Sequence, residues 1–403
     1  MRRRPGLGDL VAGGLCAGCG LCAALAGPAV EMRLTKRGFA RPATRAAVPT
    51  GTLDRILAAC PAVAVEGPDP DHATDTVWGP VQVLRRAWAV DPAVRFAGAS
   101  GGVVTALAGH LLTTGAVDAV LHAGGGERPL ETVGRVSRNV AALLAHAGSR
   151  YAPSPVLAGL AAALAEAERI AVIGKPCEIA ALRRLVRDDP SLTARIPWML
   201  SFFCAGVPSQ AGTEILLRRM GIAPERLRHL RYRGMGWPGR MTAEAEDGRI
   251  AAMSYTDSWG GELHRHLQFR CKICPDGTGE QADIAAADAW ITPSGYPDFA
   301  ERDGVSAVIA RSGRGRALLA EAEAAGVLAT APLAVVELAA MQPYQLRRKQ
   351  TVAVRVAALR LLGGRAPRYR RLRLARNALG GWRRLLRDFA GTALRVLQGR
   401  HRE

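Results

Sequence analysis

The fold depends on one stretch, Arg270-Cys-Lys-Ile-Cys274-Pro-Asp-Gly-Thr-Gly-Glu-Gln-Ala-Asp-Ile284, which holds a Cys-x-x-Cys pair, a turn and the start of an apolar-acidic run. Two thiolates at this spacing can hold one metal ion or one cluster. Tetrahedral zinc and cubane iron–sulfur clusters both need four protein ligands. Two further ligands must therefore come from elsewhere in the chain, and distant segments must converge on this stretch.

The protein has eight cysteines, which is two sets of four. Three of them form Cys16-Ala-Gly-Cys19-Gly-Leu-Cys22, and Cys60-Pro61 follows after a long insert. Three thiolates at successive three-residue spacings with one remote Cys-Pro are typical of a ferredoxin-type 4Fe-4S cluster, and the glycines let backbone amides approach its sulfurs. We therefore predict a first 4Fe-4S cluster on Cys16, Cys19, Cys22 and Cys60, with a zinc knuckle as the alternative.

The remaining cysteines are Cys177, Cys204, Cys271 and Cys274. Cys177 stands at a predicted helix start, where amides, the helix dipole and Lys175 stabilise a thiolate, as suits a ligand or a catalytic nucleophile. Cys204 ends a predicted strand, at an edge where functional groups gather, although a lone cysteine there is more often inert core. Because these two and the Cys-x-x-Cys pair total four, we predict a second 4Fe-4S cluster.

The middle of the chain alternates between strand and helix patterns. Strands are expected at 86–90, 118–122, 170–174, 199–206 and 306–310, and helices at 106–112, 157–169, 177–187 and 313–325. This alternation predicts an α/β lobe. Within it, Ser100-Gly101-Gly102 opens a helix whose unpaired amides and positive dipole end suit a phosphate, although a plain tight turn has the same residues.

A length of 403 residues predicts two or three lobes. We expect a mixed α+β and α/β fold in three parts. Residues 1–80 form a small ferredoxin-like 4Fe-4S module, closed by the Pro- and Asp-rich linker 67–72; residues 81–340 form the α/β lobe; and residues 341–403 form a basic helical tail. In the tail, basic and apolar residues alternate at 370–376 and 382–389, which predicts an amphipathic helix broken at Gly380-Gly381.

The net charge of +19 belongs mainly to this tail. From Tyr344 onward the chain has 17 basic and 2 acidic residues, a net charge of +15, which leaves +4 for the rest. Such a tail is either a solvated helical face or a surface that docks an acidic partner, a membrane surface or nucleic acid.

The longest run without charged residues, 96–117, contains serine, threonine, histidine and several glycines, so we expect a buried loop and helix there and not a membrane span. A signal peptide cut after Met-Arg-Arg-Arg would fall in or beside the first cysteine motif, and no adequate apolar region precedes it. We expect a cytoplasmic protein whose thiols are ligands and not disulfides.

Several motifs together resemble the coenzyme F420 hydrogenase/dehydrogenase beta-subunit family, from about residue 14 to about residue 370. They are Ala99-Ser-Gly-Gly-Val-Val-Thr-Ala-Leu107, Gly148-Ser-Arg-Tyr151, Gly174-Lys-Pro-Cys177, Phe203-Cys204, Arg231-Tyr-Arg-Gly-Met-Gly-Trp-Pro-Gly239, and Cys271-Lys-Ile-Cys274 with Ala282-Asp-Ile284 and Asp288-Ala-Trp290. The family includes the beta subunits of F420-reducing hydrogenase and formate dehydrogenase. Its relatives include 7-hydroxymethyl chlorophyll a reductase and divinyl chlorophyllide reductase.

The resemblance implies an FAD held by the Ser100-Gly101-Gly102 loop and neighbouring segments, one cluster close to the flavin and, in many members, a second N-terminal cluster. The implied cofactor-binding residues are Ser100, Gly101, Gly102, Val103, Thr105, Ser149, Tyr151 and Lys175. The resemblance also moves the loop 231–240, otherwise an exposed Arg-rich turn, to the rim of the flavin or substrate. It does not identify the substrate.

We therefore predict an iron–sulfur flavoprotein oxidoreductase. Electrons would pass between ferredoxin or a redox partner subunit, two 4Fe-4S clusters, FAD and an organic two-electron acceptor such as coenzyme F420, a chlorophyll-like tetrapyrrole or a biosynthetic intermediate. One alternative is a zinc-stabilised nucleic-acid-binding protein, which does not account for the Ser-Gly-Gly loop or the lone cysteines. The other is a non-catalytic subunit that relays electrons within a larger complex.

Overall fold

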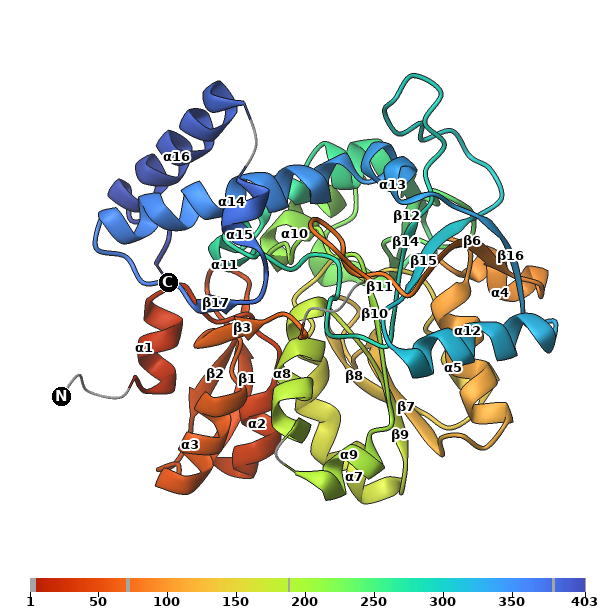
Figure 1. Cartoon of the computed structure of the whole chain (residues 1–403), viewed down its shortest axis with the longest axis horizontal. Helices are drawn as coiled ribbons and strands as arrows, with labels where there is room; N and C mark the ends of the chain where they lie inside the picture. The colour runs from red at the N-terminus through yellow and green to blue at the C-terminus, as the bar shows by residue number, and fades with distance from the viewer. Residues whose placement is uncertain (1–4, 70–72, 188, 379–380, 403) are drawn as a thin grey trace.

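An eight-stranded mixed sheet forms the centre of the protein (Figure 1). The computed structural model describes residues 5–69, 73–187, 189–378 and 381–402. The strand order is β16 (Leu328–Pro332), β6 (Val83–Ala89), β15 (Ser306–Ala310), β14 (Ile284–Asp288), β10 (Trp198–Phe202), β9 (Ile170–Gly174), β7 (Ala119–Gly125) and β8 (Thr132–Ser137). The neighbours from β7 to β14 are parallel, and both flanks of the sheet are antiparallel.

Helices cover both faces of this sheet, because its central strands are apolar on both sides. Val120 and Leu200 share one core cluster with α5 (Val103–Thr113) and α12 (Gly313–Ala324). The alternate positions Leu121 and Met199 share another with α7 (Leu160–Glu166) and α8 (Pro176–Arg187). The period of two along each strand therefore sorts the core into two layers. The shorter helices are α4 (Pro92–Ala97), α6 (Val140–Leu144), α9 (Pro190–Arg195) and α10 (Gln210–Arg219).

Each strand predicted for the α/β lobe is confirmed within a few residues, and so are the predicted helices, except that 157–169 is a 3-10 turn (Val156–Gly159) followed by α7. The sequence did not reveal β8, β14 and β16. It also did not reveal a separate sheet of β11 (Leu227–Arg231), β12 (Met241–Ala245) and β13 (Ile250–Met253). β14 reads Ile-Ala-Ala-Ala-Asp, and alanine has low β propensity, so only pairing with β10 and β15 makes it a strand.

The N-terminal part packs directly on the large lobe. It consists of α1 (Leu7–Ala12), α2 (Leu21–Ala26), the hairpin β1 (Val30–Leu34) and β2 (Ala40–Thr44), α3 (Thr50–Ala59) and β3 (Ala64–Glu66), followed by β4 (Thr74–Asp75) and β5 (Gly79–Pro80). Leu21 and Ala59 lie in the same core cluster as Ile179 and Leu182 of α8. The two parts therefore share one core at this boundary.

The C-terminal part also contributes to the core. Its elements are α13 (Val335–Met341), α14 (Pro343–Leu361), β17 (Arg368–Arg370), α15 (Leu374–Asn377) and α16 (Trp382–Leu397). β17 pairs in parallel with β3, so Arg370 is in a strand, and of the helix predicted at 370–376 only a single turn is present, in α15 from Leu374. The backbone of 368–370 forms hydrogen bonds with β3 and is therefore extended. Arg373, just before α15, has a left-handed φ of 56°. The second predicted helical stretch, 382–389, is confirmed as part of α16; Gly380 lies outside the described residues.

The uncharged run 96–117 is the end of α4, the Ser-Gly-Gly turn and the mostly buried helix α5, as predicted. Within the described ranges, no helix combines the length and the apolarity that crossing a membrane requires.

Candidate functional site

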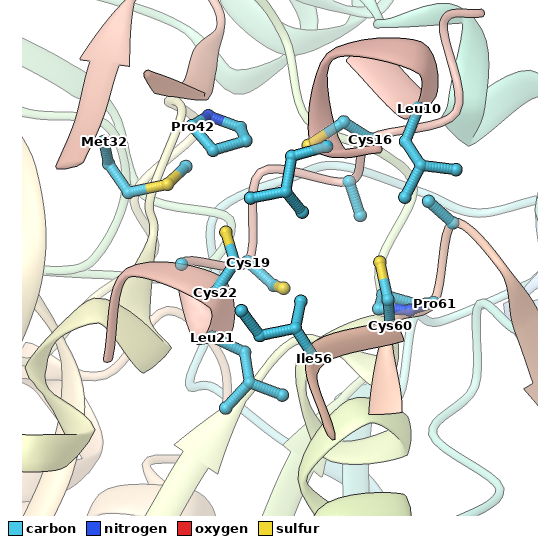
Figure 2. A pocket seen from close by; sticks show the side chains of 14 residues that line it. Leu10, Cys16, Cys19, Leu21, Cys22, Met32, Pro42, Ile56, Cys60 and Pro61 are labelled. Atoms are coloured by element: carbon cyan, nitrogen blue, oxygen red, sulfur yellow. The ribbon is translucent and has the colours of Figure 1, made fainter. Parts of the chain in front are cut away.

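The first cysteine set surrounds a small cavity of about 30 Å³ (Figure 2). Cys16 and Cys19 lie on the loop that leads into α2, Cys22 is in the first turn of α2, and Cys60 ends α3. The other walls are apolar and include Leu10, Leu21, Ile56 and Ala62. The backbone amide of Gly18 donates to Cys16 Sγ at 3.4 Å. The structure thus brings the four predicted ligands of the first cluster together.

Gly20, between two of these cysteines, has a positive φ of 88°. A Cβ at this position would lie 2.5 Å from the backbone nitrogen of Ala158, in the 3-10 turn before α7. The amide of Leu157 donates to the carbonyl of Cys19 at 2.9 Å in the same place. The cysteine loop is therefore fixed against the large lobe by backbone contacts that only glycine permits.

The thiols of the first set lie in an environment that disfavours bare thiolates. Burial, then Cys16 and Cys60, raises the pKa of Cys22 to about 12. Burial and Cys16 raise the pKa of Cys60 to about 11, although Arg270 acts in the opposite direction. The raised pKa values favour the neutral thiols of Cys22 and Cys60, so these two side chains are poor free nucleophiles.

The second cysteine set is assembled from three separate segments. Cys177 is in the first turn of α8 directly after β9, and Cys204 follows β10. Cys271 is in the one-turn helix α11 (Phe269–Lys272), and Cys274 follows it. Carboxyl ends of adjacent parallel strands meet at one edge of a sheet, which explains how Cys177 and Cys204 come to face the Cys-x-x-Cys pair.

The members of this second set act on one another electrostatically. Burial, then Cys271, raises the pKa of Cys204 to about 12, while Arg348 and Lys175 oppose the shift. Burial raises the pKa of Cys177, and Cys204 and Cys274 add to the effect. The Cys271 sulfur accepts hydrogen bonds from the Val207 amide at 3.4 Å and from Gln268 Nε2 at 3.3 Å. These thiols therefore lie near one another, with Lys175 and Arg348 close by and two N–H donors on the Cys271 sulfur.

Among the described residues, no three histidine, cysteine, aspartate or glutamate side chains lie close enough together to hold a single metal ion. Tetrahedral zinc with Zn–S bonds of about 2.3 Å draws its sulfurs to roughly 3.8 Å from one another. A cubane cluster holds each sulfur on a different iron atom and so keeps its ligands farther apart.

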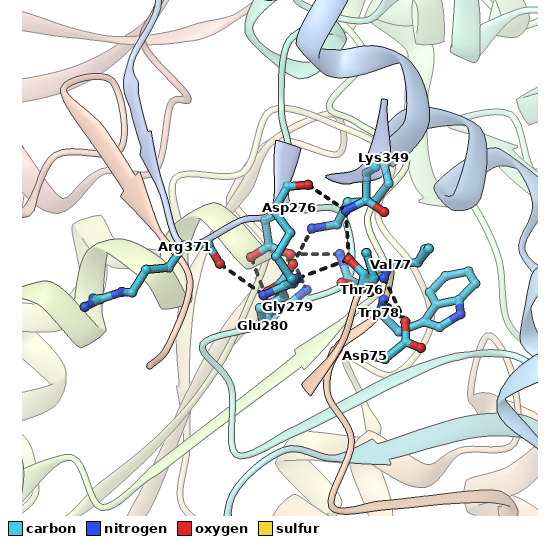
Figure 3. A network of polar contacts seen from close by, with 12 residues as sticks. Asp75, Thr76, Val77, Trp78, Asp276, Gly279, Glu280, Lys349 and Arg371 are labelled. Carbon is cyan, nitrogen blue, oxygen red and sulfur yellow. Dashed lines mark hydrogen bonds and ion pairs between the residues drawn. The ribbon is translucent and has the colours of Figure 1, made fainter. Parts of the chain in front are cut away.

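A buried ionic network holds the loop that follows Cys274 (Figure 3). Asp276 accepts hydrogen bonds from the amides of Thr278 and Gly279, at 3.0 and 2.8 Å. Glu280 is fully buried and pairs with Lys349 of α14 and with Arg373. The C-terminal part thus fixes the backbone on which two ligands of the second set are mounted, and breaking such a buried pair costs about 3–5 kcal/mol.

A second cavity, of about 540 Å³, opens beside the second cysteine set. Seven of the eight predicted cofactor-binding residues line it: Ser100, Gly102, Val103, Thr105, Ser149, Tyr151 and Lys175. Gly101 is the exception, because its amide points to Ser306 Oγ at 3.0 Å. Cys204 also lines this cavity, so a thiol of the second set lies in its wall.

The N-terminus of α5 faces the cavity through residues 102–105. Gly102 has a φ of 72°, and a Cβ there would lie 2.7 Å from the carbonyl oxygen of Val94. The first amides of a helix have no partner within the helix, and its dipole is positive at this end. The turn therefore offers the cavity a site for a phosphate.

Lys175 is placed in the cavity wall, but its ammonium group is occupied. It donates to Ser154 Oγ at 2.8 Å, to the Ser154 carbonyl at 2.6 Å and to Glu178 at 2.5 Å. Lys175 and Glu178 are both buried. This side chain braces the wall between the cavity and Cys177, and its three hydrogen bonds leave no N–H for a ligand.

The burial of the loop 231–239 in the far wall of the cavity was not predicted from its residues alone. Arg233, in the loop that the residues alone would leave exposed, is 3% exposed and makes two hydrogen bonds to Asp288, at 3.0 and 2.6 Å. Trp237 Nε1 also donates to Asp288, at 2.7 Å, and the Trp237 ring stacks on Trp290 at 4.8 Å. The resemblance had placed this loop at the rim of the cofactor. The aromatic residues of 231–239 are the signal that favours a buried position.

Two histidines of the cavity wall had no role in the sequence interpretation, and the two aspartates of the quoted motifs differ in position. His122 and His146 line the cavity with ring centroids 5.7 Å apart, and His122 Nε2 lies 2.7 Å from Ser137 Oγ. Burial lowers the pKa of His122, so its ring is held neutral. Asp288 lines the cavity, whereas Asp283 is buried away from it and accepts hydrogen bonds from Met199 N at 3.0 Å and Ser312 Oγ at 2.9 Å.

Two family models match most of the large lobe. The model for the N-terminal part of the coenzyme F420 hydrogenase/dehydrogenase beta subunit matches residues 84–161. The model for the C-terminal part of the same beta subunit matches residues 167–335. Together they span the cavity-lining turn at 98–105, Cys177, Cys204 and the Cys-x-x-Cys pair.

Individual curated proteins and a solved structure are also similar to this chain. The coenzyme F420 hydrogenase subunit beta of Methanothermobacter thermautotrophicus is 24% identical over 303 residues, which are 71% of this chain and 98% of the relative. The coenzyme F420-dependent sulfite reductase of Methanocaldococcus jannaschii is 26% identical over 214 residues, 49% of this chain and 32% of the relative. A chain of the F420-reducing [NiFe] hydrogenase complex from Methanosarcina barkeri shares the fold, with a TM-score of 0.52 and 21% identity over 69% of this chain and 95% of that one.

Proposed function

The chain belongs to the coenzyme F420 hydrogenase/dehydrogenase beta-subunit family, and on this premise we propose that it is an iron–sulfur flavoprotein oxidoreductase with two 4Fe-4S clusters and one FAD. Its relatives are named as F420-linked oxidoreductases or as beta subunits of them, which supports an oxidoreductase role. When bound, the clusters would carry single electrons, and the flavin would combine them into two-electron chemistry with an organic acceptor.

The position of Cys204 is the observation that carries the proposal. Cys204 belongs to the second cysteine set by its interactions with Cys271 and Cys274, and it also lines the large cavity. The cavity wall contains the N-terminus of α5, which suits the phosphates of a dinucleotide cofactor. An electron carrier held by the cysteines would thus lie beside a cofactor held in the cavity.

The residues present fit these groups. Each cysteine set supplies four buried or half-buried thiols and no disulfide, which is the donor set of a 4Fe-4S cluster. The cavity volume is within the range of about 300–1,000 Å³ that is usual for ligand sites. The turn at Ser100-Gly101-Gly102 and Val103 with Thr105 would hold the phosphates, while Ser149, Tyr151 and the brace Lys175 would shape the rest of the wall.

The division of the chain follows from this assignment. We propose residues 1–80 as the ferredoxin-like module of the first cluster, 81–340 as the lobe of the second cluster and FAD, and 341–403 as the basic C-terminal part. Cysteine sets that serve as metal ligands suit a reducing compartment, and we propose the cytoplasm.

The partner would be ferredoxin or another acidic redox subunit, docked on α16. The outer face of α16 exposes a stripe of Trp382, Leu386, Leu394 and Leu397, whose exposed fractions lie between 55% and 73%. Exposed arginines flank this stripe, among them Arg383 and Arg387. An apolar centre with a charged rim is typical of a protein interface, and a positive rim favours an acidic partner. An anionic membrane surface is the competing occupant of the same stripe.

Nucleic acid is a less suitable partner, because several tail cations are already neutralised inside the protein. Arg347 and Arg355 pair with Asp388, and Arg371 pairs with Glu66. Lys349 and Arg373 share Glu280. The net charge of the sequence therefore overstates the positive charge that the surface offers to a phosphate backbone.

The test is anaerobic production with ample iron, followed by measurement of iron, labile sulfide and flavin. We expect about eight irons per chain, as two cubanes require, and one releasable FAD. Reduction of F420, of a tetrapyrrole and of smaller acceptors by reduced ferredoxin would then be assayed. A colourless zinc protein without flavin would disprove the proposal. If the cofactor-loaded protein reduces an acceptor only when a second subunit is added, the chain is an electron-relay subunit of a larger complex.

A further inference from the structure

We propose that Arg270 is a positioning residue shared by the two iron–sulfur sites, and that its guanidinium donates to sulfur on both sides and stabilises the reduced form of both clusters. This inference rests on the proposed function, because it needs both clusters to be present. It concerns a side chain that belongs to neither set of ligands.

The position of Arg270 connects the two cysteine sets. Its backbone directly precedes Cys271, so it is mounted on the second set. Its Nη2 atom donates to the carbonyl oxygen of Pro61 at 3.1 Å, and Pro61 directly follows Cys60 of the first set. The side chain therefore reaches from the backbone of one ligand to the backbone beside a ligand of the other.

The guanidinium is buried and incompletely bonded. Arg270 is 2% exposed, and its Nε and Nη1 atoms are buried without a hydrogen-bond partner among the described residues. The Tyr369 ring, with its centroid 5.9 Å from Arg270 Cζ, provides a cation–π contact. No ion pair in the described part of the chain includes Arg270. A buried cation with two unpartnered nitrogen atoms and no carboxylate beside it is costly unless an anion accepts from them.

The anions available to Arg270 are the cysteine sulfurs. Cys271 directly follows Arg270 in α11, and the carbonyl that Arg270 Nη2 contacts directly follows Cys60. A 4Fe-4S cluster with four thiolates carries a negative charge that grows on reduction. N–H groups and positive charge directed at its sulfurs therefore favour the reduced state.

Two other buried arginines show that this arrangement is specific. Arg348 also lies near Cys204, but its Nη atoms donate to the carbonyls of Cys204 and Ala205, and so hold the backbone. Arg311 is 5% exposed and has an unpartnered Nε, but it donates to the carbonyls of Trp78, Pro80 and Thr278. The charges that act on the pKa of Arg311 are Glu280, Asp276 and Arg373, and no thiol is among them.

The experiment compares Arg270→Gln, Arg270→Met and Arg270→Lys with wild type and with the control Arg311→Met, all reconstituted anaerobically. Iron and sulfide are counted, and each cluster is titrated potentiometrically by spin-resonance spectroscopy. In the variants without the charge we expect both clusters to become harder to reduce by at least about tenfold, which is about 59 mV for one electron. Arg270→Lys keeps the charge without the planar fork and should restore only part of each shift. Arg311→Met should leave both potentials unchanged.

The outcomes separate the inference from its premise. Wild type without two clusters would refute the proposed function. The role of Arg270 alone would be refuted if wild type holds two clusters and Arg270→Gln or Arg270→Met also holds two, with unchanged reduction potentials. A shift confined to one cluster would also refute the shared role. If Arg270→Gln and Arg270→Met are folded but lose both clusters, the shared role of Arg270 is supported, because removal of a single cysteine ligand should empty only one site. If these variants lose only one of the two clusters, the shared role is refuted.

Discussion

The two cysteine sets differ in how the chain assembles them and in the charge that surrounds them. The first set is built by one local motif and the end of α3, and its cavity has mainly apolar walls. The second set is gathered from two strand ends and a one-turn helix, and Lys175 and Arg348 act on it in addition to Arg270, which also acts on Cys60 of the first set. The difference indicates that the second site holds extra negative charge more readily, so a cluster there should have the higher reduction potential.

The two cysteine sets also differ in the parts of the protein that they contact. Cys204 of the second set lines the large cavity, and no cysteine of the first set does. The first set lies in the N-terminal part, whose core continues into α14 and α16 through Val352 and Val396. The first site is therefore the candidate entry point for electrons, and the second is the candidate neighbour of the flavin.

The largest effect is expected from Cys274→Ala. This substitution should remove the second cluster, leave the first and lower the rate of flavin reduction by reduced ferredoxin at least about 100-fold, because no carrier remains beside the cavity. Flavin should bind more weakly as well, since the ligands and the cavity share one lobe. Stopped-flow absorbance and iron analysis measure these changes. Unchanged flavin reduction would show that the second set is not on the electron path.

Cys19→Ala is the matched substitution in the first set. It should remove about half of the iron and keep FAD, and a small one-electron dye should still reduce the flavin through the second cluster. The spin-resonance signal that remains in this variant should come from the second cluster, which should have the higher reduction potential of the two clusters. Cys60→Ala should give the same spectrum. If the spectra of these two variants differed, the division of the eight cysteines into two sets would be wrong.

Gly102→Ala tests the cavity without touching a thiol. The new Cβ would lie 2.7 Å from the Val94 carbonyl at a φ of 72°, so the turn before α5 must shift. We expect about a tenfold loss of FAD affinity, which is about 1.4 kcal/mol, with the full iron content retained. Gly115→Ala is the control, because its φ is 69° but its Cβ would meet no atom within 4 Å. Equal flavin loss in both variants would attribute the effect to backbone strain alone.

The smallest effect is expected from Arg383→Glu with Arg387→Glu on α16. Neither residue touches either cysteine set, so both clusters and FAD should remain. Affinity for ferredoxin should fall by about tenfold at low salt, and the difference should shrink as salt is added. Binding is measured by calorimetry at two ionic strengths, with Arg128→Glu as an exposed control. Unchanged ferredoxin affinity together with lost binding to anionic vesicles would make a membrane the occupant of this face.

The sequence predicted the parts of the protein whose residues lie close together in the chain. The spacing of Cys16, Cys19 and Cys22 is dictated by one metal centre, so the motif is visible without any fold. The strands at 119–125 and 170–174 are apolar runs between turns, and the Ser-Gly-Gly turn opens the helix that it predicted. Local spacing and periodicity carry this information because they depend only on near neighbours.

Only the tertiary structure decided the rest. It made a strand of Ile284–Asp288 despite its alanines, buried Arg233 against Asp288, and drew Arg368–Arg370 into pairing with β3. It also placed Arg270 between Cys271 and Pro61, a relation that spans more than two hundred residues of sequence. Burial and pairing of this kind arise when distant segments pack together, so the free energy that selects them depends on contacts that no local pattern encodes.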